Sequence, residues 1–199
     1  MKENIVAVDI HRHIPASFER VPRGEYGYNA KQVDQFLQRA RVSLETPKAA
    51  THVINSGDVR AVSFDPVKGG YSAAVVDAAL DRLEDAFARR ERDELIAASG
   101  EDAWLREIGK LSGILRGRLH RADGERFRRP SKNKARSYNT VDVDNLCRDL
   151  IGYLEEDQPL SVDNVRRAVF RPAVGKDGYE ENQVDAFLDR VVELMAAID

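Results

Sequence analysis

One short pattern occurs four times in this chain of 199 residues: a tyrosine is followed six residues later by an aspartate, with a valine directly before the aspartate. Such internal repetition indicates a fold built from similar units that pack on one another. It also argues against catalysis, because an active site needs one asymmetric cluster of residues. The tyrosine–aspartate pairs are Tyr28–Asp34, Tyr71–Asp77, Tyr138–Asp144 and Tyr179–Asp185, and the phenylalanines that precede them by seven to eleven residues are Phe18, Phe64, Phe127 and Phe170.

The four copies are themselves arranged in two pairs. Tyr28 and Tyr138 are 110 residues apart, and Tyr71 and Tyr179 are 108 residues apart. We therefore predict two tandem halves, at 1–100 and 101–199. The first half contains repeats around 18–44 and 64–98, and the second contains a helix at 101–119 followed by repeats around 127–156 and 170–198.

A helical period follows each tyrosine. The apolar residues step by four, three and four positions, which is the a/d spacing of a heptad. Each series lasts about two heptads, and isolated helices of that length are marginal in water, so they must pack on one another. We predict an all-α protein in which these short helices pack as helical hairpins in two tandem halves. The four series are Val33, Leu37, Ala40, Leu44; Val76, Leu80, Leu83, Phe87; Val143, Cys147, Leu150, Leu154; and Val184, Leu188, Val191, Met195.

The segments before the tyrosines are rich in proline, glycine and basic residues. By composition they are predicted to be loops, at 21–27, 66–70, 129–136 and 171–178. A further apolar stripe, at Trp104, Ile108, Leu111, Leu115 and Leu119, predicts the helix at 101–119, with Glu101 and Asp102 at the positive end of its dipole.

The repeated unit, with its phenylalanine, basic loop, Gly-Tyr and Val-Asp-x-Phe-Leu, resembles the short signature of the DivIVA family. The best matches are residues 27–37 and 178–189. The second copy keeps Gly70-Tyr71 and Val76-Asp77 but has Ala79 in the phenylalanine position. The third copy keeps only Phe127, Tyr138, Val143-Asp144 and Leu146. The four copies cover about half of the chain.

The resemblance implies a cytoplasmic protein that marks division septa or cell poles in Gram-positive bacteria. In that family the loop before Gly-Tyr touches the membrane and a long parallel coiled coil drives oligomerisation. Carried over, the loop corresponds to Val21, Pro22 and Arg23, to Val67 and Lys68, and to Val174 and Lys176. This chain has no long coil and is similar to actinobacterial proteins that consist of repeated signatures. Division or envelope proteins are the partners that it implies, and a homo-oligomer stays open.

Charge is distributed unevenly along the chain. The net charge is −3, but residues 116–136 hold nine Lys or Arg against two acidic residues, a local charge of +7, which leaves −10 on the remainder. Three interpretations stay open for this segment: a solvated linker, attraction to an anionic membrane surface, or contact with nucleic acid. In the membrane interpretation the contact residues are Arg23, Lys68, Lys176, Arg128, Arg129, Lys132 and Lys134.

The sequence gives little support for a membrane-spanning segment or for a metal site. No apolar run approaches the roughly 18 residues needed to cross a bilayer, and the lone Cys147 is compatible with a reducing cytoplasm. The His-x-His of residues 11–13 has no further ligand cluster, with only His52 and His120 elsewhere, so neither a metal nor another cofactor is expected.

These observations predict a non-enzymatic DivIVA-like interaction or scaffold protein associated with bacterial cell division or envelope growth. It would act by peripheral membrane contact or by binding a protein partner. The alternative is a regulatory nucleic-acid-associated protein that uses the basic segment 116–136. We interpret the repeated Phe, Tyr and Asp as structural: the tyrosine packs over the first helical turn and the aspartate pairs with an arginine or a helix end.

Overall fold

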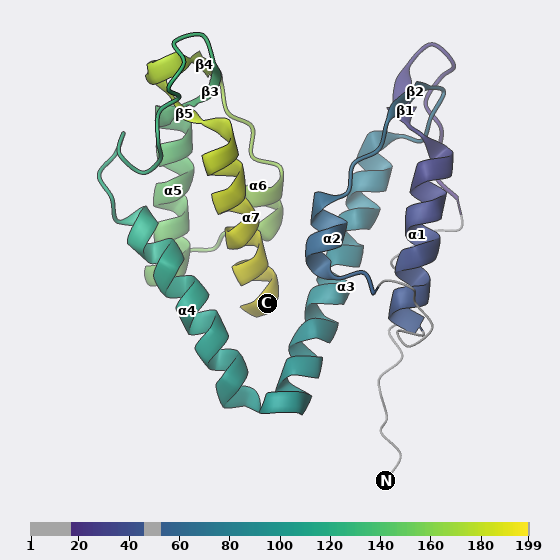
Figure 1. Ribbon diagram of the computed structural model, residues 1–199, viewed down its shortest axis with the longest axis horizontal. Helices are drawn as coiled ribbons and strands as arrows, with labels where there is room; N and C mark the ends of the chain where they lie inside the picture. The colour runs from purple at the N-terminus through teal and green to yellow at the C-terminus, as the bar shows by residue number, and fades with distance from the viewer. Residues whose placement is uncertain (1–16, 46–52, 199) are drawn as a thin grey trace. The chain divides into compact units, whose positions relative to one another are not determined.

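The computed structural model describes residues 17–45 and 53–198 (Figure 1). The chain divides into two compact units, Met1–Glu94 and Leu95–Asp199. The fold is mostly helical, at 63% helix, with seven α-helices in the part of the chain that is described. Two small antiparallel sheets accompany the helices.

The first unit alternates short strands with helices. Strand β1 (Tyr26–Tyr28) leads into α1 (Ala30–Glu45), and the short α2 (Ser56–Ala61) leads into β2 (Pro66–Lys68) and α3 (Ala73–Ser99), which continues past the unit boundary. Strands β1 and β2 pair antiparallel, with Tyr26 opposite Lys68 and Tyr28 opposite Pro66.

The second unit repeats this order after an additional helix, α4 (Glu101–Leu119). The elements that follow are β3 (Arg136–Asn139), α5 (Thr140–Glu155), α6 (Val162–Arg166), β4 (Pro172–Val174), the 3-10 turn η3 (Gly175–Asp177), β5 (Gly178–Glu180) and α7 (Glu181–Ile198). Its three strands are antiparallel, with β3 in the middle.

The strands correct the prediction of an all-α fold with loops before the tyrosines. Each segment predicted as a loop contains, or ends in, a three- or four-residue strand that pairs with the corresponding segment of the other repeat in its unit. Such strands are too short to show an alternating pattern, and their partners lie about 40 residues away in sequence. Composition therefore indicated turns where the chain forms pairs of extended segments.

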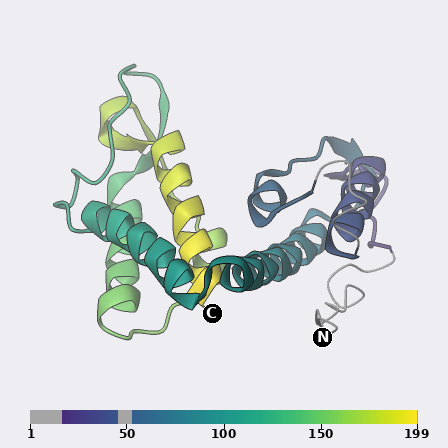
Figure 2. The ribbon, with the colours of Figure 1, turned by 60° about the horizontal axis from the view of Figure 1, so that its bottom comes forward.

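The predicted helical period marks the buried faces correctly. The valine before each signature aspartate is at most 1% exposed. In the first unit most of the buried apolar residues of α1 and α3 belong to one hydrophobic cluster, which includes Phe18 and Val59. In the second unit the same holds for α5 and α7, and α4 adds Leu111, Leu115 and Leu119 to the cluster. The helix α4 lies beside α5 and α7 (Figures 1 and 2).

Local sequence explains where several helices begin. The side-chain oxygens of Asn29 and Asn139 accept backbone N–H groups of the first turns of α1 and α5. Asn55 and Asp58 form a reciprocal capping box on α2, and Ser161 caps α6. These caps fix the points at which extended chain becomes helix.

Two further observations concern membrane-spanning helices and metal-binding clusters. Within residues 17–45 and 53–198, no helix combines the length and the apolar character that crossing a membrane would require. The same residues contain no cluster of three or more His, Cys, Asp or Glu that could hold a metal ion. The His-x-His of residues 11–13 and His52 lie outside the described residues.

Candidate functional site

The signature aromatic residues meet across the interface between the two repeats of each unit, which we call the repeat interface. Each phenylalanine packs on the tyrosine of the other copy, not on the tyrosine that follows it in sequence. The ring centroids lie 5.3 Å apart for Phe18–Tyr71, 5.5 Å for Phe64–Tyr28, 5.2 Å for Phe127–Tyr179 and 5.1 Å for Phe170–Tyr138. The exchange is reciprocal in both units, and its geometry is that of favourable aromatic pairs.

Backbone hydrogen bonds repeat the exchange. The residue after each tyrosine donates its N–H to the carbonyl of the residue after the other copy's phenylalanine. The donor–acceptor distances are 2.9 Å for Asn29 to Asp65, 2.8 Å for Ser72 to Glu19, 2.9 Å for Asn139 to Arg171 and 2.9 Å for Glu180 to Arg128. The four bonds tie the start of each signature helix to the opposite repeat.

The tyrosine hydroxyls complete the interface by reaching the aspartates of the opposite copy. Tyr71 lies 3.4 Å from Asp34, and Tyr179 donates to Asp144 at 3.0 Å. Tyr28 and Tyr138 hydrogen-bond to Asp77 and Asp185 in the same way. The expected partner of the aspartate, an arginine or a helix end, was therefore wrong for Asp34 and Asp185, where tyrosine fills that role, and right for Asp144, which also pairs with Arg126.

This environment keeps the tyrosines protonated. Burial, with the carboxylate of Asp185 beside the hydroxyl, raises the pKa of Tyr138 to about 12. Burial, reinforced by Asp144, likewise raises the pKa of Tyr179 to about 12. The pKa values of Tyr28 and Tyr71 are also raised, for the same reasons. Each tyrosine is thus a hydrogen-bond donor fixed in place, as a structural contact requires.

Glycine permits the closest approach in the first unit. A Cβ on Gly27 would lie 2.3 Å from the carbonyl oxygen of Tyr71, and a Cβ on Gly70 would lie 2.4 Å from that of Tyr28. In the first unit the glycine of each Gly-Tyr pair is therefore required by the close approach of the two backbones. In the second unit the position of Gly27 is taken by Ser137, whose buried hydroxyl has no hydrogen-bond partner.

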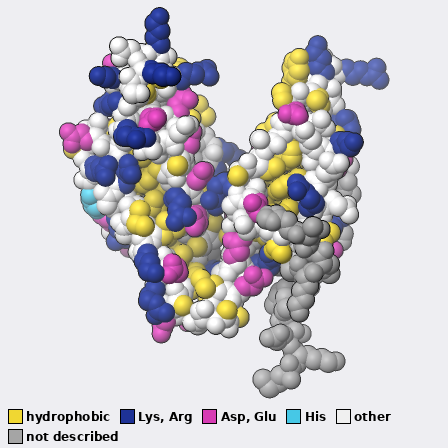
Figure 3. Space-filling model, in the orientation of Figure 1, with side chains coloured by type: hydrophobic (Ala, Val, Ile, Leu, Met, Phe, Trp, Pro, Cys, Tyr) yellow, Lys and Arg dark blue, Asp and Glu magenta, His cyan; other side chains and the backbone are white. Residues whose placement is uncertain are grey.

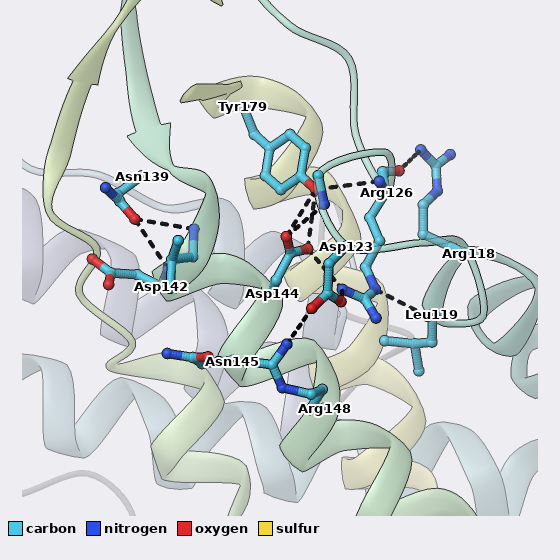
Figure 4. A network of polar contacts seen from close by, with 12 residues as sticks. Arg118, Leu119, Asp123, Arg126, Asn139, Asp142, Asp144, Asn145, Arg148 and Tyr179 are labelled. Atoms are coloured by element: carbon cyan, nitrogen blue, oxygen red, sulfur yellow. Dashed lines mark hydrogen bonds and ion pairs between the residues drawn. The ribbon is translucent and has the colours of Figure 1, made fainter. Parts of the chain in front are cut away.

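The signature aspartate of the third copy forms a buried ion pair at the repeat interface of the second unit (Figure 4). Arg126 and Asp144 are 4% and 3% exposed, and the Arg126 Nη1 donates to the Asp144 carboxylate at 2.8 Å. Asp144 also accepts from the backbone N–H of Gly124 at 2.8 Å, and the Nε of Arg126 donates to the carbonyl of Leu119 at 2.9 Å. The network extends to the exposed Asp123, which binds both Arg126 and Arg148.

Arg126 was not recognised in the sequence as an interface residue. It stands directly before Phe127, where the other copies have Ser17, Ser63 and Val169. The arginine in place of serine or valine was the sequence signal that could have identified this residue. Because it lies among the many basic residues of 116–136, it was interpreted as one more exposed charge. With both charges paired and further hydrogen-bonded, the burial of this arginine is compensated.

Several other arginines of the basic segment 116–136 also bind within the second unit. Arg116 donates to the carbonyl of Leu154, and Arg118 donates to that of Arg126 and lies over the Phe127 ring. Arg129 lies over the ring of Tyr179, 5.0 Å from its centroid, and donates to Gly124 and Lys176. The segment is therefore a folded part of the unit, and the interpretation as a solvated linker is incomplete.

The predicted contact residues lie where strands and turns form one end of each unit. We call residues 19–27 and 65–70 the first tip, and residues 128–137 and 171–178 the second tip; each stretch runs from the residue after a phenylalanine to the residue before a tyrosine. Arg23 and Lys68 are exposed at the first tip, where Lys68 lies over the 66% exposed ring of Tyr26. Val21 and Val67 are partly buried.

The second tip carries more exposed charge. Lys132, Lys134 and Lys176 are exposed, and Val174 beside them is 56% exposed. Arg128 is exposed but forms an ion pair with Glu180 at 3.0 Å. Lys and Arg side chains gather over the β3–β4–β5 end of this unit in Figure 3. The signature residues thus hold the interior of the interface, while the predicted contact residues, except the stacked Arg129, face outward.

A separate depression of about 420 Å³ opens between α4, α5 and α7. Ile108, Tyr153 and Leu194 line it together with Arg116 and residues 157–159. Tyr138, Tyr179 and the buried thiol of Cys147, whose pKa values are raised to about 12, belong to the repeat interface and the core and do not line this depression.

No protein-family model, curated protein or solved structure matches this chain.

Proposed function

We propose that this chain is a non-enzymatic interaction or scaffold protein with DivIVA-like repeats that acts in bacterial cell division or envelope growth. Each unit would be a pair of repeats packed as a helical hairpin within one chain. The observation that carries the proposal is the reciprocal exchange of phenylalanine, tyrosine and backbone hydrogen bonds between repeats, made in both units. Residues that serve this exchange are committed to packing, and perturbed tyrosines of this kind do not form a catalytic cluster.

The exchange leaves the strand-and-turn tips as the surfaces for partners. Each helix of a pair buries its apolar face against the other repeat, so the helices have little left for a long intermolecular coil. The exposed tip residues Arg23 and Lys68, and Lys132, Lys134 and Lys176, remain for division or envelope proteins or for peripheral contact with an anionic membrane. Contact of this kind would be reversible and electrostatic.

The alternative function, a regulatory protein that binds nucleic acid through residues 116–136, has the exposed lysines of the second tip in its favour. Against it, Arg118, Arg126 and Arg129 are engaged inside the unit, and the two aromatics of the region, Phe127 and Tyr138, pack on Tyr179 and Phe170. A single-strand-binding surface needs aromatics that bases can stack on.

Localisation of a fluorescent fusion in the native cell tests the proposal. We expect fluorescence at septa, poles or sites of envelope growth. A fusion with the mild interface substitution Asp34→Ala serves as a control, because it alters no tip residue and should leave both units folded. Diffuse fluorescence throughout growth would contradict the envelope function, and fluorescence that coincides with the nucleoid would favour the alternative.

A further inference from the structure

The two tips share a backbone design but differ in charge. In each unit a glycine with positive φ follows the second strand, Gly69 at 67° and Gly175 at 56°. Its N–H donates to the first segment of its tip, Gly69 to the carbonyl of Glu25 at 2.9 Å and Gly175 to that of Ala135 at 2.8 Å. The two segments of a tip are therefore clamped together at the same point in both units, and their side chains can be compared directly.

The first tip is electrically balanced. Its basic residues are Arg20, Arg23 and Lys68, and its acidic residues are Glu19, Glu25 and Asp65, so its net charge is 3 − 3 = 0. Arg20 is also engaged within the unit, since it donates to the carbonyl of Gly69 and lies over the Tyr71 ring. A neutral tip gains little from an anionic surface.

The second tip is strongly cationic. It has seven basic residues, namely Arg128, Arg129, Lys132, Lys134, Arg136, Arg171 and Lys176, and one acidic residue, Asp177, so its net charge is 7 − 1 = +6. Glu180 and Asp142 pair with Arg128 and Arg171, which still leaves 5 − 1 = +4. This charge lies on a few turns and not along a whole helix, so its field is concentrated at one end of the unit.

Close packing of the two turns concentrates this charge. A Cβ on Gly175 would lie 2.4 Å from the carbonyl oxygen of Asn133, so only glycine lets the 131–135 turn approach η3 this closely. The approach brings the turn that bears Lys132 and Lys134 against the turn that bears Lys176. Val174, more than half exposed, pairs with Arg136 across strands β4 and β3. The exposed apolar side chain of Val174 thus lies on the same tip as the three exposed lysines and opposite Arg136 in the sheet.

We infer that the second tip alone binds an anionic lipid surface, while the first tip, of the same fold, does not; this rests on the proposed envelope function and assigns its membrane contact to one unit. The exposed Val174 favours lipid over nucleic acid, because an apolar side chain among cations suits the boundary between headgroups and acyl chains. No exposed aromatic ring lies among the described residues of this tip. Val174 would be immersed while the lysines remain at the level of the headgroups.

Cosedimentation of the full chain with phosphatidylglycerol-containing vesicles and with phosphatidylcholine vesicles tests the inference. Lys132→Gln/Lys134→Gln and Arg23→Gln/Lys68→Gln form a matched pair, since each removes two exposed positive charges from one tip. At about fivefold per basic residue, the second-tip variant should bind anionic vesicles about 25-fold more weakly. The first-tip variant should stay within about twofold of the unmodified chain, and high salt should weaken binding by shortening the Debye length.

The possible results distinguish a wrong choice of tip, an absent lipid contact and a nucleic-acid contact. Equal losses in the two variants would overturn the assignment to one tip. No binding of the unmodified chain to anionic vesicles at low salt would overturn the lipid contact itself. Val174→Asn should weaken vesicle binding severalfold, whereas salt-sensitive binding to duplex DNA that ignores this substitution, without vesicle binding, would assign the second tip to nucleic acid. Envelope localisation without vesicle binding would refute this inference and retain the proposed function through a protein partner.

Discussion

Replacing Asp144 by alanine should destabilise the second unit far more than replacing Asp34 destabilises the first, although the two aspartates occupy the same position in their repeats. Asp144 accepts hydrogen bonds from the Tyr179 hydroxyl, from Arg126 and from the backbone of Gly124. Its removal leaves the Arg126 guanidinium buried, with the exposed Asp123 as its remaining acidic partner. Asp34 is exposed, and its bond to Tyr71 is long at 3.4 Å.

The expected magnitudes differ severalfold. Breaking a buried ion pair by removing one partner costs about 3–5 kcal/mol, and here it leaves the buried Arg126 charge with only the exposed Asp123 as its partner. At about 4 °C per kcal/mol for a unit of this size, Asp144→Ala should lower the melting temperature of the second unit by roughly 12–20 °C. Asp34→Ala removes one weak and partly solvated hydrogen bond and should cost about 0.5–1 kcal/mol.

The single tryptophan makes the measurement selective. Trp104 is the only tryptophan in the chain and lies half-buried in the first turn of α4, so its fluorescence reports the unfolding of this helix of the second unit. Thermal and urea unfolding, monitored by Trp104 fluorescence and by far-ultraviolet circular dichroism, give the change in the free energy of unfolding. Dichroism also records the first unit in the Asp34→Ala variant.

A double substitution distinguishes lost pairing from general damage. Arg126→Met combined with Asp144→Ala removes the buried charge as well as its partner, and should recover about half or more of the stability lost in Asp144→Ala. Equal and small effects of Asp144→Ala and Asp34→Ala would refute the account of the ion pair. A double variant less stable than Asp144→Ala would refute it as well.

Three further predictions concern the interior of the two units. Gly70→Ala should cost about 1–3 kcal/mol because the added Cβ meets a carbonyl, whereas Ser137→Ala should be neutral or stabilise by about 1 kcal/mol because it removes an unpaired buried hydroxyl; urea unfolding checks both, and the reverse order would contradict the packing. The pKa values of Tyr138 and Tyr179, about 12 in the folded chain, exceed the value of about 10 in unfolded chains, so their contribution to stability is complete below about pH 10 and is lost as the pH rises through about 12. Tyrosinate absorbance should therefore show these two titrating late, and titration of every tyrosine near pH 10 would be inconsistent with it. The Cys147 thiol, whose pKa burial raises to about 12, should react with a thiol reagent only as fast as the second unit opens, and rapid labelling of the native chain would show that it is not enclosed.

The helical part of the fold could be predicted because its information is local. The apolar steps of four and three residues identified the buried valines, and the range predicted for the helix at 101–119 coincides with α4. Asn29 and Asn139, which follow two of the tyrosines, could be predicted as helix caps for the same reason, because a cap binds the first turn of its own helix.

The repeat interface could be predicted only in part because its contacts are not local. The pattern identified the right residues, but nothing within one copy tells whether Phe127 packs on Tyr138, 11 residues away, or on Tyr179 in the next copy. The strands were missed because their pairing depends on a second short segment far along the chain. Arg126 was missed because a buried arginine and a solvated one look alike in sequence.

The exchange of aromatic partners between repeats is the central claim, and a double-mutant cycle in the second unit tests it most directly. Phe127→Leu is combined once with Tyr179→Leu and once with Tyr138→Leu, and the free energy of unfolding is followed by Trp104 fluorescence. The account predicts a coupling energy of about 0.5–1.5 kcal/mol between Phe127 and Tyr179, whose rings are in contact, and additive effects for Phe127 and Tyr138. Coupling of Phe127 to Tyr138 and not to Tyr179 would contradict it, because each repeat would then pack its own aromatic pair.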